Sequence, residues 1–196
     1  MLLETEVRRF SFPVTDATDR WSSAPASGAS CRIIRSPQHS TEKIFPRIKE
    51  DFIDTNKVTY TIIPVSFLPN SMPAAIALLC VYYADPLYPN SELFFNYLEY
   101  IFSHQPPESV NWTTTKELLN YAKETSPAID LERLGKCIDK ESYRTRIEKN
   151  TAYGASLMGG VIATPSLYVN GIKVESLTYE SVAKLVQEVM ENEGVH

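Results

Sequence analysis

The sequence predicts an α/β protein in which a helical insertion interrupts a small mixed sheet. Three observations lead to this prediction: a strand–helix–strand pattern over residues 31–67, helical patterns over about 71–158, and a strand–turn–strand–helix pattern after residue 160. Two strands joined through a helix form a βαβ unit, whose strands pair in parallel. Because the last two strands and helix can complete the same sheet, we expect a single domain over residues 29–196.

The βαβ unit begins with a strand expected at Cys31–Arg35. A helix should follow, because apolar residues recur every three or four positions, and Pro46 should kink it. These apolar residues are Ile44, Phe45, Ile48, Phe52 and Ile53. The second strand is expected at Lys57–Phe67, a stretch rich in β-branched and aromatic residues. Residues 1–28 show neither the helical nor the strand period of apolar residues, and they are expected to form an irregular N-terminal segment.

The C-terminal part closes the predicted fold. Asn170-Gly171 separates two apolar stretches, which is typical of the tight turn of an antiparallel hairpin. A final helix should then present one core face, because its apolar residues fall at i, i+3, i+4, i+7 and i+8. They are Val182, Leu185, Val186, Val189 and Met190.

Composition narrows the possible partners. The formal charge is −5 and the pI is near 5.3. Nucleic acid and anionic membranes attract basic surfaces, so we expect neither as a partner. Acidic Glu4 and Glu6 interrupt the N-terminal region, which therefore lacks the apolar core of a signal peptide. We expect a cytoplasmic protein as the chain stands, or a periplasmic one if a leader has been removed; the oligomeric state stays open.

Cysteine and histidine spacing argues against a metal site. The chain has three cysteines, Cys31, Cys80 and Cys137, and three scattered histidines, with no C-x-x-C pair. This spacing matches no zinc pattern. A lone free cysteine most often serves as a small buried apolar residue.

Several stretches together resemble the DsbA-like proteins of the thioredoxin fold, from about Ala29 to the C-terminus. They are IFPRIKEDFIDTNKV leading into TIIPVSFL, the helix carrying Cys80, LERLGKCIDKESYRTRIEKN, and ATPSLYVNGIKV. The resemblance implies a thioredoxin fold (βαβ…ββα) with a helical insertion. It also implies that Pro165, after Thr164, has a cis peptide bond and faces the first helix beside a groove for extended polypeptide.

The same resemblance exposes a missing motif. Such proteins carry C-P-x-C between the first strand and the kinked helix, where this chain has Ser36-Pro37-Gln38-His39. Thiol–disulfide exchange needs a thiolate and a second thiol that resolves the mixed disulfide. A serine hydroxyl does neither, and a histidine at a helix N-terminus is disfavoured as the cation. The alternative for Ser36 and His39 is a helix cap and a solvated side chain, and Pro37 then fits the first helical position.

The three cysteines have separate expectations. Cys31 is near the motif but begins a strand, so it is a fallback candidate for a catalytic single thiol. Cys80 and Cys137 fall where many DsbA-like proteins have a second, structural disulfide. In a reducing compartment the same two residues would be buried thiols.

Three functions remain open. The first is a disulfide isomerase or oxidoreductase by family, with activity reduced or lost. The second is a non-catalytic module, such as a chaperone, that holds extended or unfolded polypeptide near Pro165. There we expect the backbone of Ala163 and Thr164 to be unpaired, and the side chains of Val161 and Ile162 to lie in the core rather than line a pocket.

The third function is a glutathione-dependent transferase or isomerase of the kappa type. In that class a serine followed by proline replaces the motif, and Ser36-Pro37 fits this. A serine hydroxyl can hydrogen-bond the thiolate that glutathione brings. No cofactor is expected, apart from glutathione under this alternative.

Overall fold

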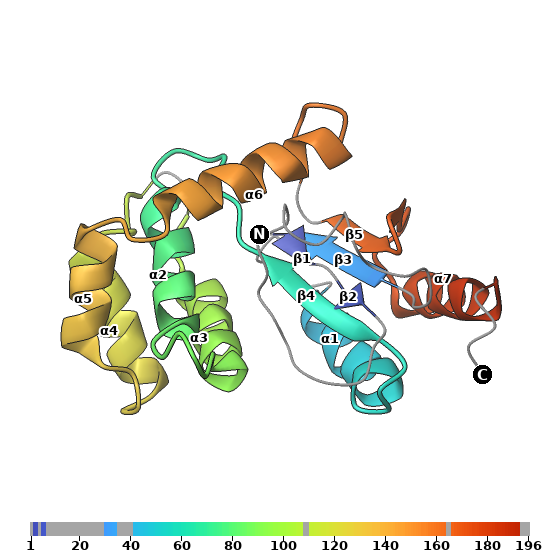
Figure 1. The fold of residues 1–196 in the computed structure, drawn as a ribbon, viewed down its shortest axis with the longest axis horizontal. Helices are drawn as coiled ribbons and strands as arrows, with labels where there is room; N and C mark the ends of the chain where they lie inside the picture. The colour runs from blue at the N-terminus through green and yellow to red at the C-terminus, as the bar shows by residue number, and fades with distance from the viewer. Residues whose placement is uncertain are drawn as a thin grey trace. The chain divides into compact units, whose positions relative to one another are not determined.

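The computed structural model describes residues 2–3, 5–6, 30–34, 41–107, 110–163 and 166–192. The chain divides into two compact units: Met1–Ile63 with Tyr153–His196, and Pro64–Ala152. The first contains the sheet, and we call it the sheet unit; the second is the helical unit (Figure 1). The helical unit corresponds to the insertion expected at about 71–158.

The sheet unit is built on a mixed sheet with strand order β1-β4-β3-β5-β6, in which β2 also pairs with β3. The strands are β1 (Leu2–Leu3), β2 (Thr5–Glu6), β3 (Ser30–Ile34), β4 (Thr59–Ile63), β5 (Ser166–Val169) and β6 (Ile172–Lys173). β3 and β4 are parallel, and β5 is antiparallel to both β3 and β6. This is the predicted βαβ unit and C-terminal hairpin. Asn170 and Gly171 form the hairpin turn with φ of 48° and 80°, as the Asn-Gly signal predicts.

Two sequence expectations about strands were wrong. Residues 1–28 are not wholly irregular, because β1 pairs antiparallel with β3 and β4, and β2 pairs antiparallel with β3. The predicted strand Lys57–Phe67 is only Thr59–Ile63, since Pro64 has no N–H to donate to a ladder. β-strand propensity alone did not reveal where β4 ends, because the apolar stretch continues beyond Pro64.

The helices of the sheet unit are α1 (Thr41–Ile48), the π-helix η1 (Lys49–Ile53) and α7 (Tyr179–Asn192). Pro46 lies inside α1, and α1 continues into η1, whose π-helical turn is closed by a bond from Asp54 N–H to Lys49 O of 2.8 Å. On α7, Val182, Val186 and Val189 are buried, which confirms the predicted core face.

A polar cluster joins α1 and η1 to α7. The Arg47 guanidinium lies 3.5 Å from the centre of the Tyr179 ring and 3.5 Å from a Glu180 carboxylate oxygen. The Tyr179 hydroxyl donates to Asp51, and this hydrogen bond raises the pKa of Tyr179. The members interact with one another, and they link α1 and η1 to α7 at an exposed position.

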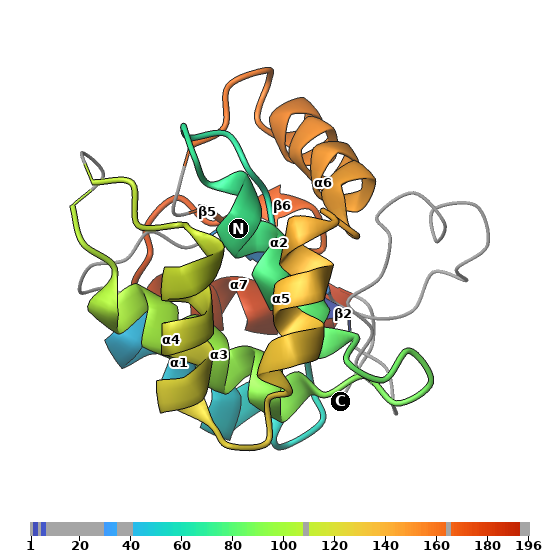
Figure 2. The same ribbon diagram turned by 90° about the vertical axis from the view of Figure 1, so that its left-hand side faces the viewer.

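The helical unit contains α2 (Met72–Tyr82), α3 (Ser91–His104), α4 (Thr115–Thr125) and α5 (Leu131–Asp139), which are labelled in Figure 2. The unit boundary falls within α6 (Arg144–Leu157), after Ala152. The helical patterns predicted over about 71–158 thus correspond to the helices α2 to α6. The side chains of Asn90, Thr114 and Asp130 cap α3, α4 and α5, each accepting a backbone N–H of the first turn. α2 is the centre of this core, because every residue from Ala75 to Tyr82 is buried.

Helix α6 also fixes the segment that follows β4. Asn150, 1% exposed, donates from Nδ2 to Pro64 O at 3.1 Å, and Thr151 Oγ1 accepts from Ser66 N–H at 2.9 Å. These bonds satisfy backbone groups that lost a strand partner at Pro64. No helix in the described part of the chain has both the length and the apolar character needed to cross a membrane.

Tyr97 is a fully buried tyrosine of the helical unit. The side chain is 0% exposed, and its hydroxyl donates to Leu118 O at 2.8 Å, which links α3 to α4. Burial raises the pKa of Tyr97, because the tyrosinate would lose its hydration. In the unfolded chain the same group ionises near pH 10, the ordinary tyrosine value of about 10.

Stability should therefore depend on pH through Tyr97 only in alkali. The contribution is complete below about pH 10 and decreases as the pH rises above it, because the unfolded chain then releases a proton that the folded chain keeps. We expect Tyr97→Phe to lower the free energy of unfolding at pH 7 by about 1 kcal/mol, from the lost hydrogen bond. The same substitution should also make the decrease in the free energy of unfolding above pH 10 less steep. Denaturant unfolding from pH 7 to 11 measures both, with Tyr88→Phe, at an exposed position, as control. Equal pH profiles for Tyr97→Phe and the unaltered chain would contradict this reading.

Candidate functional site

The register of the sheet brings two strand ends together. Ile34, the last residue of β3, pairs with Ser166, the first residue of β5. The predicted site residues continue the chain from these two ends: Ser36, Pro37, Gln38 and His39 after β3, and Thr164 and Pro165 before β5. All six lie outside the described residues, so their roles and the cis bond at Pro165 remain predictions. The described register places their points of attachment at the same edge of the sheet.

Cys31 lies away from that edge. It pairs with Val169 of β5 on one side and with Thr5 of β2 on the other. It is three residues before Ile34, a distance of about 10 Å along a strand. Cys31 is thus near the start of β3, as the sequence predicted, and it is separated from the end of β3 where the family motif would begin.

The segment before β5 corrects two expectations. The backbone of Ala163 is not unpaired: its N–H donates to Met158 Sδ at 3.3 Å, and its carbonyl accepts from Ser166 Oγ at 2.8 Å. Val161, expected in the core, is 75% exposed. A serine immediately after the proline offered a signal, because a serine hydroxyl commonly bonds to a nearby backbone carbonyl. An incoming strand would have to use the second lone pair of the Ala163 carbonyl or replace Ser166.

Two glycines direct the chain into this segment. Gly159 and Gly160, at the end of α6, have φ of 71° and 101°. Gly160 N–H donates to Ala155 O at 2.8 Å and Gly159 N–H to Ser156 O at 3.5 Å, which is the Schellman ending of a helix. Because side chains are strained at such φ values, glycine at these positions fixes where α6 ends and where the approach to β5 begins.

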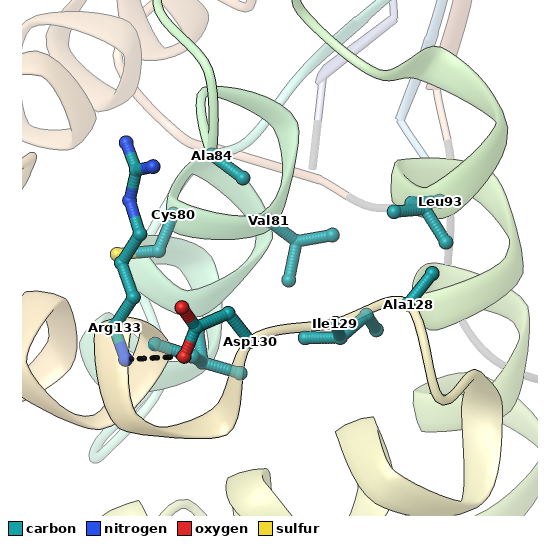
Figure 3. A pocket seen from close by; sticks show the side chains of 9 residues that line it. Cys80, Val81, Ala84, Leu93, Ala128, Ile129, Asp130 and Arg133 are labelled. Atoms are coloured by element: carbon teal, nitrogen blue, oxygen red, sulfur yellow. Dashed lines mark hydrogen bonds between the residues drawn. The ribbon is translucent and has the colours of Figure 1, made fainter.

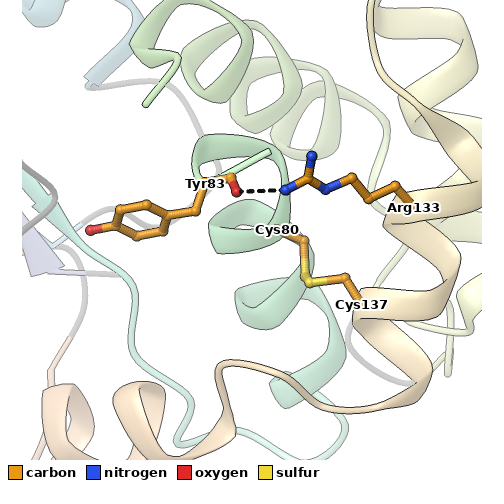
Figure 4. Close-up of a disulfide and its surroundings, with 4 residues drawn as sticks. All are labelled: Cys80, Tyr83, Arg133 and Cys137. Carbon is orange, nitrogen blue, oxygen red and sulfur yellow. Dashed lines mark hydrogen bonds between the residues drawn. A yellow bond between two sulfur atoms is a disulfide. The ribbon is translucent and has the colours of Figure 1, made fainter. Parts of the chain in front are cut away.

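Cys80 of α2 and Cys137 of α5 are joined by a disulfide, in agreement with the pairing that the resemblance implies. The sulfur atoms are 2.03 Å apart and the Cα atoms 6.1 Å apart. Beside the bond, the Arg133 guanidinium reaches the carbonyl of Tyr83 at the end of α2, with a distance of 3.5 Å (Figure 4). Cys80 is only 6% exposed, so a thiolate released there would be poorly solvated. The bond is therefore suited to a structural role.

The pocket beside this disulfide is too small for a substrate. It holds about 20 Å³, room for about one water-sized group. It is lined by Cys80, Val81, Ala84, Leu93, Ala128, Ile129, Asp130, Arg133 and Leu134. Asp130 Oδ1 accepts the backbone N–H of Arg133 at 3.0 Å, while the Arg133 guanidinium points away from this carboxylate (Figure 3).

Two tyrosines near the end of α2 were not anticipated. The rings of Tyr83 and Tyr143 stack with centres 5.6 Å apart, and the Arg146 guanidinium lies 5.0 Å from the Tyr83 ring centre. Burial raises the pKa of both tyrosines, and Arg146 partly offsets this. They are neutral at physiological pH. Tyr143 and Arg146 are three residues apart at the start of a helix, but no sequence signal pairs them with Tyr83 on another helix.

No group of metal-ligating side chains occurs within the described ranges. The candidate site is therefore still the predicted one, at the edge where β3 ends and β5 begins. Known proteins with the same fold are the basis for assigning a function to that edge of the sheet.

The model of the thioredoxin family matches residues 38–188. Disulfide bond formation protein D of Bacillus subtilis is 29% identical over 160 residues, which cover 81% of this chain and 66% of that protein. The chain thus spans slightly less than two thirds of this relative.

Solved structures agree with the sequence match. The crystal structure of DsbA from Chlamydia trachomatis superposes with a TM-score of 0.71 at 30% identity, covering 82% of this chain and 85% of that one. Oxidised BdbD from Bacillus subtilis gives a TM-score of 0.65 at 27% identity, with 81% and 85% covered. With its mixed sheet, its helical insertion and these relatives, the chain belongs to the DsbA-like proteins of the thioredoxin family.

Proposed function

We propose that this chain is a DsbA-like protein that binds extended polypeptide at the edge where β3 ends and β5 begins, with little or no dithiol redox activity. The observation that carries the proposal is the distribution of its cysteines. Of the three in the sequence, Cys80 and Cys137 are bonded to each other in the helical unit, and Cys31 lies within β3. Residues 36–39 contain no cysteine, so neither a nucleophilic thiolate nor a resolving thiol is available there.

Binding is the activity that can survive this loss. In the family to which the chain belongs, the groove beside the proline before β5 accepts extended substrate. Here Thr164 and Pro165 occupy that position in the sequence, and Ile34 and Ser166 anchor the two sides. Main-chain hydrogen bonds and side-chain contacts can then hold an added strand without any thiol chemistry. Affinity should be modest, because a short segment loses conformational entropy when it is ordered.

The disulfide also bears on where the protein works. Disulfides persist in oxidising compartments such as the periplasm and are rare in the cytosol. The Cys80–Cys137 bond therefore supports the periplasmic rather than the cytoplasmic expectation. Unfolded polypeptide is the substrate class that such a compartment supplies to this family.

Titration with a carboxymethylated, permanently unfolded model protein tests the proposal. We expect saturable binding that weakens by about tenfold or more, about 1.4 kcal/mol, in Pro165→Ala. The reason is that alanine loses the fixed φ of proline and gains an N–H at the strand entrance. A matched control is Pro69→Ala, an exposed proline of the helical unit. Binding that is absent, or equal in the two variants, would reject the proposed groove.

Binding of glutathione distinguishes the second candidate function, a glutathione-dependent enzyme, from the main proposal. The Ser36-Pro37 pair is the observation that favours it. Saturable glutathione binding that is lost in Ser36→Ala would support a glutathione-dependent enzyme of the kappa type. Unfolded polypeptide that binds equally well to Ser36→Ala and the unaltered chain would support the main proposal.

A further inference from the structure

We propose that four aromatic side chains on the helical unit form a second binding surface, specific for proline-containing polypeptide in the polyproline II conformation. We call this set the aromatic row: Trp112, Tyr121, Tyr100 and His104. It joins α3, α4 and the segment before α4. The proposal stands independently of the groove beside Pro165.

The row is continuous. The rings of Tyr100 and His104 stack with centres 4.0 Å apart, those of Tyr100 and Tyr121 are 5.7 Å apart, and those of Tyr121 and Trp112 are 5.9 Å apart. Polyproline II advances about 3.1 Å per residue and repeats every three residues, so two neighbouring residues on one ridge of the ligand can lie across neighbouring rings of the row. A ligand of that conformation can therefore contact successive rings.

Hydrogen bonds to the backbone fix the row in place. Tyr121 Oη donates to His104 O at 3.1 Å, and His104 Nδ1 lies 2.9 Å from Tyr100 O and 3.1 Å from Ser103 Oγ. Rings that are already ordered lose little further entropy when a ligand binds. This arrangement is the preorganisation that a weakly interacting peptide needs.

The row faces solvent and offers free donors. His104 is exposed, and the other three rings are partly exposed, unlike the fully buried Tyr97 of the same helix α3. Within the described residues, neither the indole N–H of Trp112 nor the hydroxyl of Tyr100 has a hydrogen-bond partner. A polyproline II segment has unpaired carbonyl acceptors and flat pyrrolidine rings, so it matches both features.

Charge excludes another ligand that stacks on aromatic rings. The pKa of Tyr121 is raised by burial and then by the nearby carboxylate of Glu117 and by Tyr100, which places an acidic group beside the row. Single-stranded nucleic acid combines stacking with a need for positive charge, so it is disfavoured here. Polyproline II is also a major conformer of unfolded chains, which makes polypeptide the ligand that fits.

The test is a fluorescence titration with a proline decamer. Because the chain has two tryptophans, Trp21→Phe leaves Trp112 as the single tryptophan, whose emission is excited selectively at a wavelength that tyrosine does not absorb. We expect a saturable change in emission with a Kd on the order of 0.1–1 mM, as for a short peptide ligand. Tyr100→Leu, which keeps apolar bulk but removes the ring and hydroxyl, should weaken binding at least about fivefold. Tyr88→Leu is the matched control, because Tyr88 is an exposed tyrosine of the same unit outside the row.

The remaining outcomes decide against the proposal. Equal binding of a Gly-Ser decamer, saturable binding of a linear oligosaccharide in place of the proline decamer, or self-association through Trp112 would each overturn it. Circular dichroism and thermal unfolding of Tyr100→Leu would show whether the variant is folded; if it is not, Tyr100→Phe, which removes only the hydroxyl, should still weaken decamer binding. Pro165→Ala should bind the decamer as the unaltered chain does, so failure of the groove and failure of the aromatic row can be told apart.

Discussion

Removing the disulfide, in Cys80→Ala/Cys137→Ala, is expected to lower the free energy of unfolding of the helical unit by about 2–4 kcal/mol. The two cysteines are 57 residues apart. Closing a loop of this length restricts the unfolded chain, and the chain-entropy estimate for it is about 4 kcal/mol. The variant should nevertheless stay folded at 25 °C, because α2 is buried from Ala75 to Tyr82 against the other helices whether or not the bond is present.

Urea unfolding followed by circular dichroism measures the loss, and hydrogen exchange locates it. Faster exchange should be concentrated in α2 and α5, the two helices that the bond joins. Reducing agent added to the unaltered chain should reproduce the variant's stability, and it should have no effect on the variant itself. A variant as stable as the unaltered chain, or one that exchanges faster only in the sheet unit, would show that this bond does not restrain the helical unit.

The order of the helices and strands could be predicted because each long element has its own spacing of apolar residues. The apolar spacing on α7 and the Asn170-Gly171 turn are local signals, and both are confirmed by burial and by φ. The ends of β4 depended on Pro64, whose effect on the ladder competes with the strand propensity of its neighbours. The pairing of β1 and β2 with β3 and β4 is long-range, and two-residue strands carry no period from which it could be read.

Predictions about the site were limited for the same reason. The family resemblance identified Cys80 and Cys137 as partners, which no local pattern could do across 57 residues. In contrast, the expectation of a free backbone at Ala163 considered only the missing N–H of Pro165. It overlooked the hydroxyl of Ser166, which reaches back to the Ala163 carbonyl. The aromatic row needs rings from two helices and a loop, so it becomes visible only when α3 and α4 are packed.

The second large effect concerns redox chemistry: this chain should not catalyse the reduction of insulin by dithiothreitol above the uncatalysed rate. Exchange through residues 36–39 would need a thiolate and a second thiol, and neither is present. Cys31, about 10 Å along β3 from the end of the strand, has no cysteine beside it to resolve a mixed disulfide. Cys80 is buried in its bond to Cys137 and would make a poorly solvated leaving group.

A gain of activity provides the matched comparison. Ser36→Cys/His39→Cys creates the sequence C-P-Q-C. If Ser36-Pro37-Gln38-His39 occupies the family's site, this variant should reduce insulin at least about tenfold faster than the unaltered chain. The reason is that it gains both the attacking and the resolving thiol. Turnover by the unaltered chain that disappears in Cys31→Ala would instead identify Cys31 as a single-thiol nucleophile. Turnover that persists in Cys31→Ala would assign exchange to Cys80 and Cys137. The double variant could also be folded, bind unfolded polypeptide and yet be inactive. The groove would then be retained without the geometry that thiol exchange requires, and residues 36–39 would be a helix start rather than a former active site.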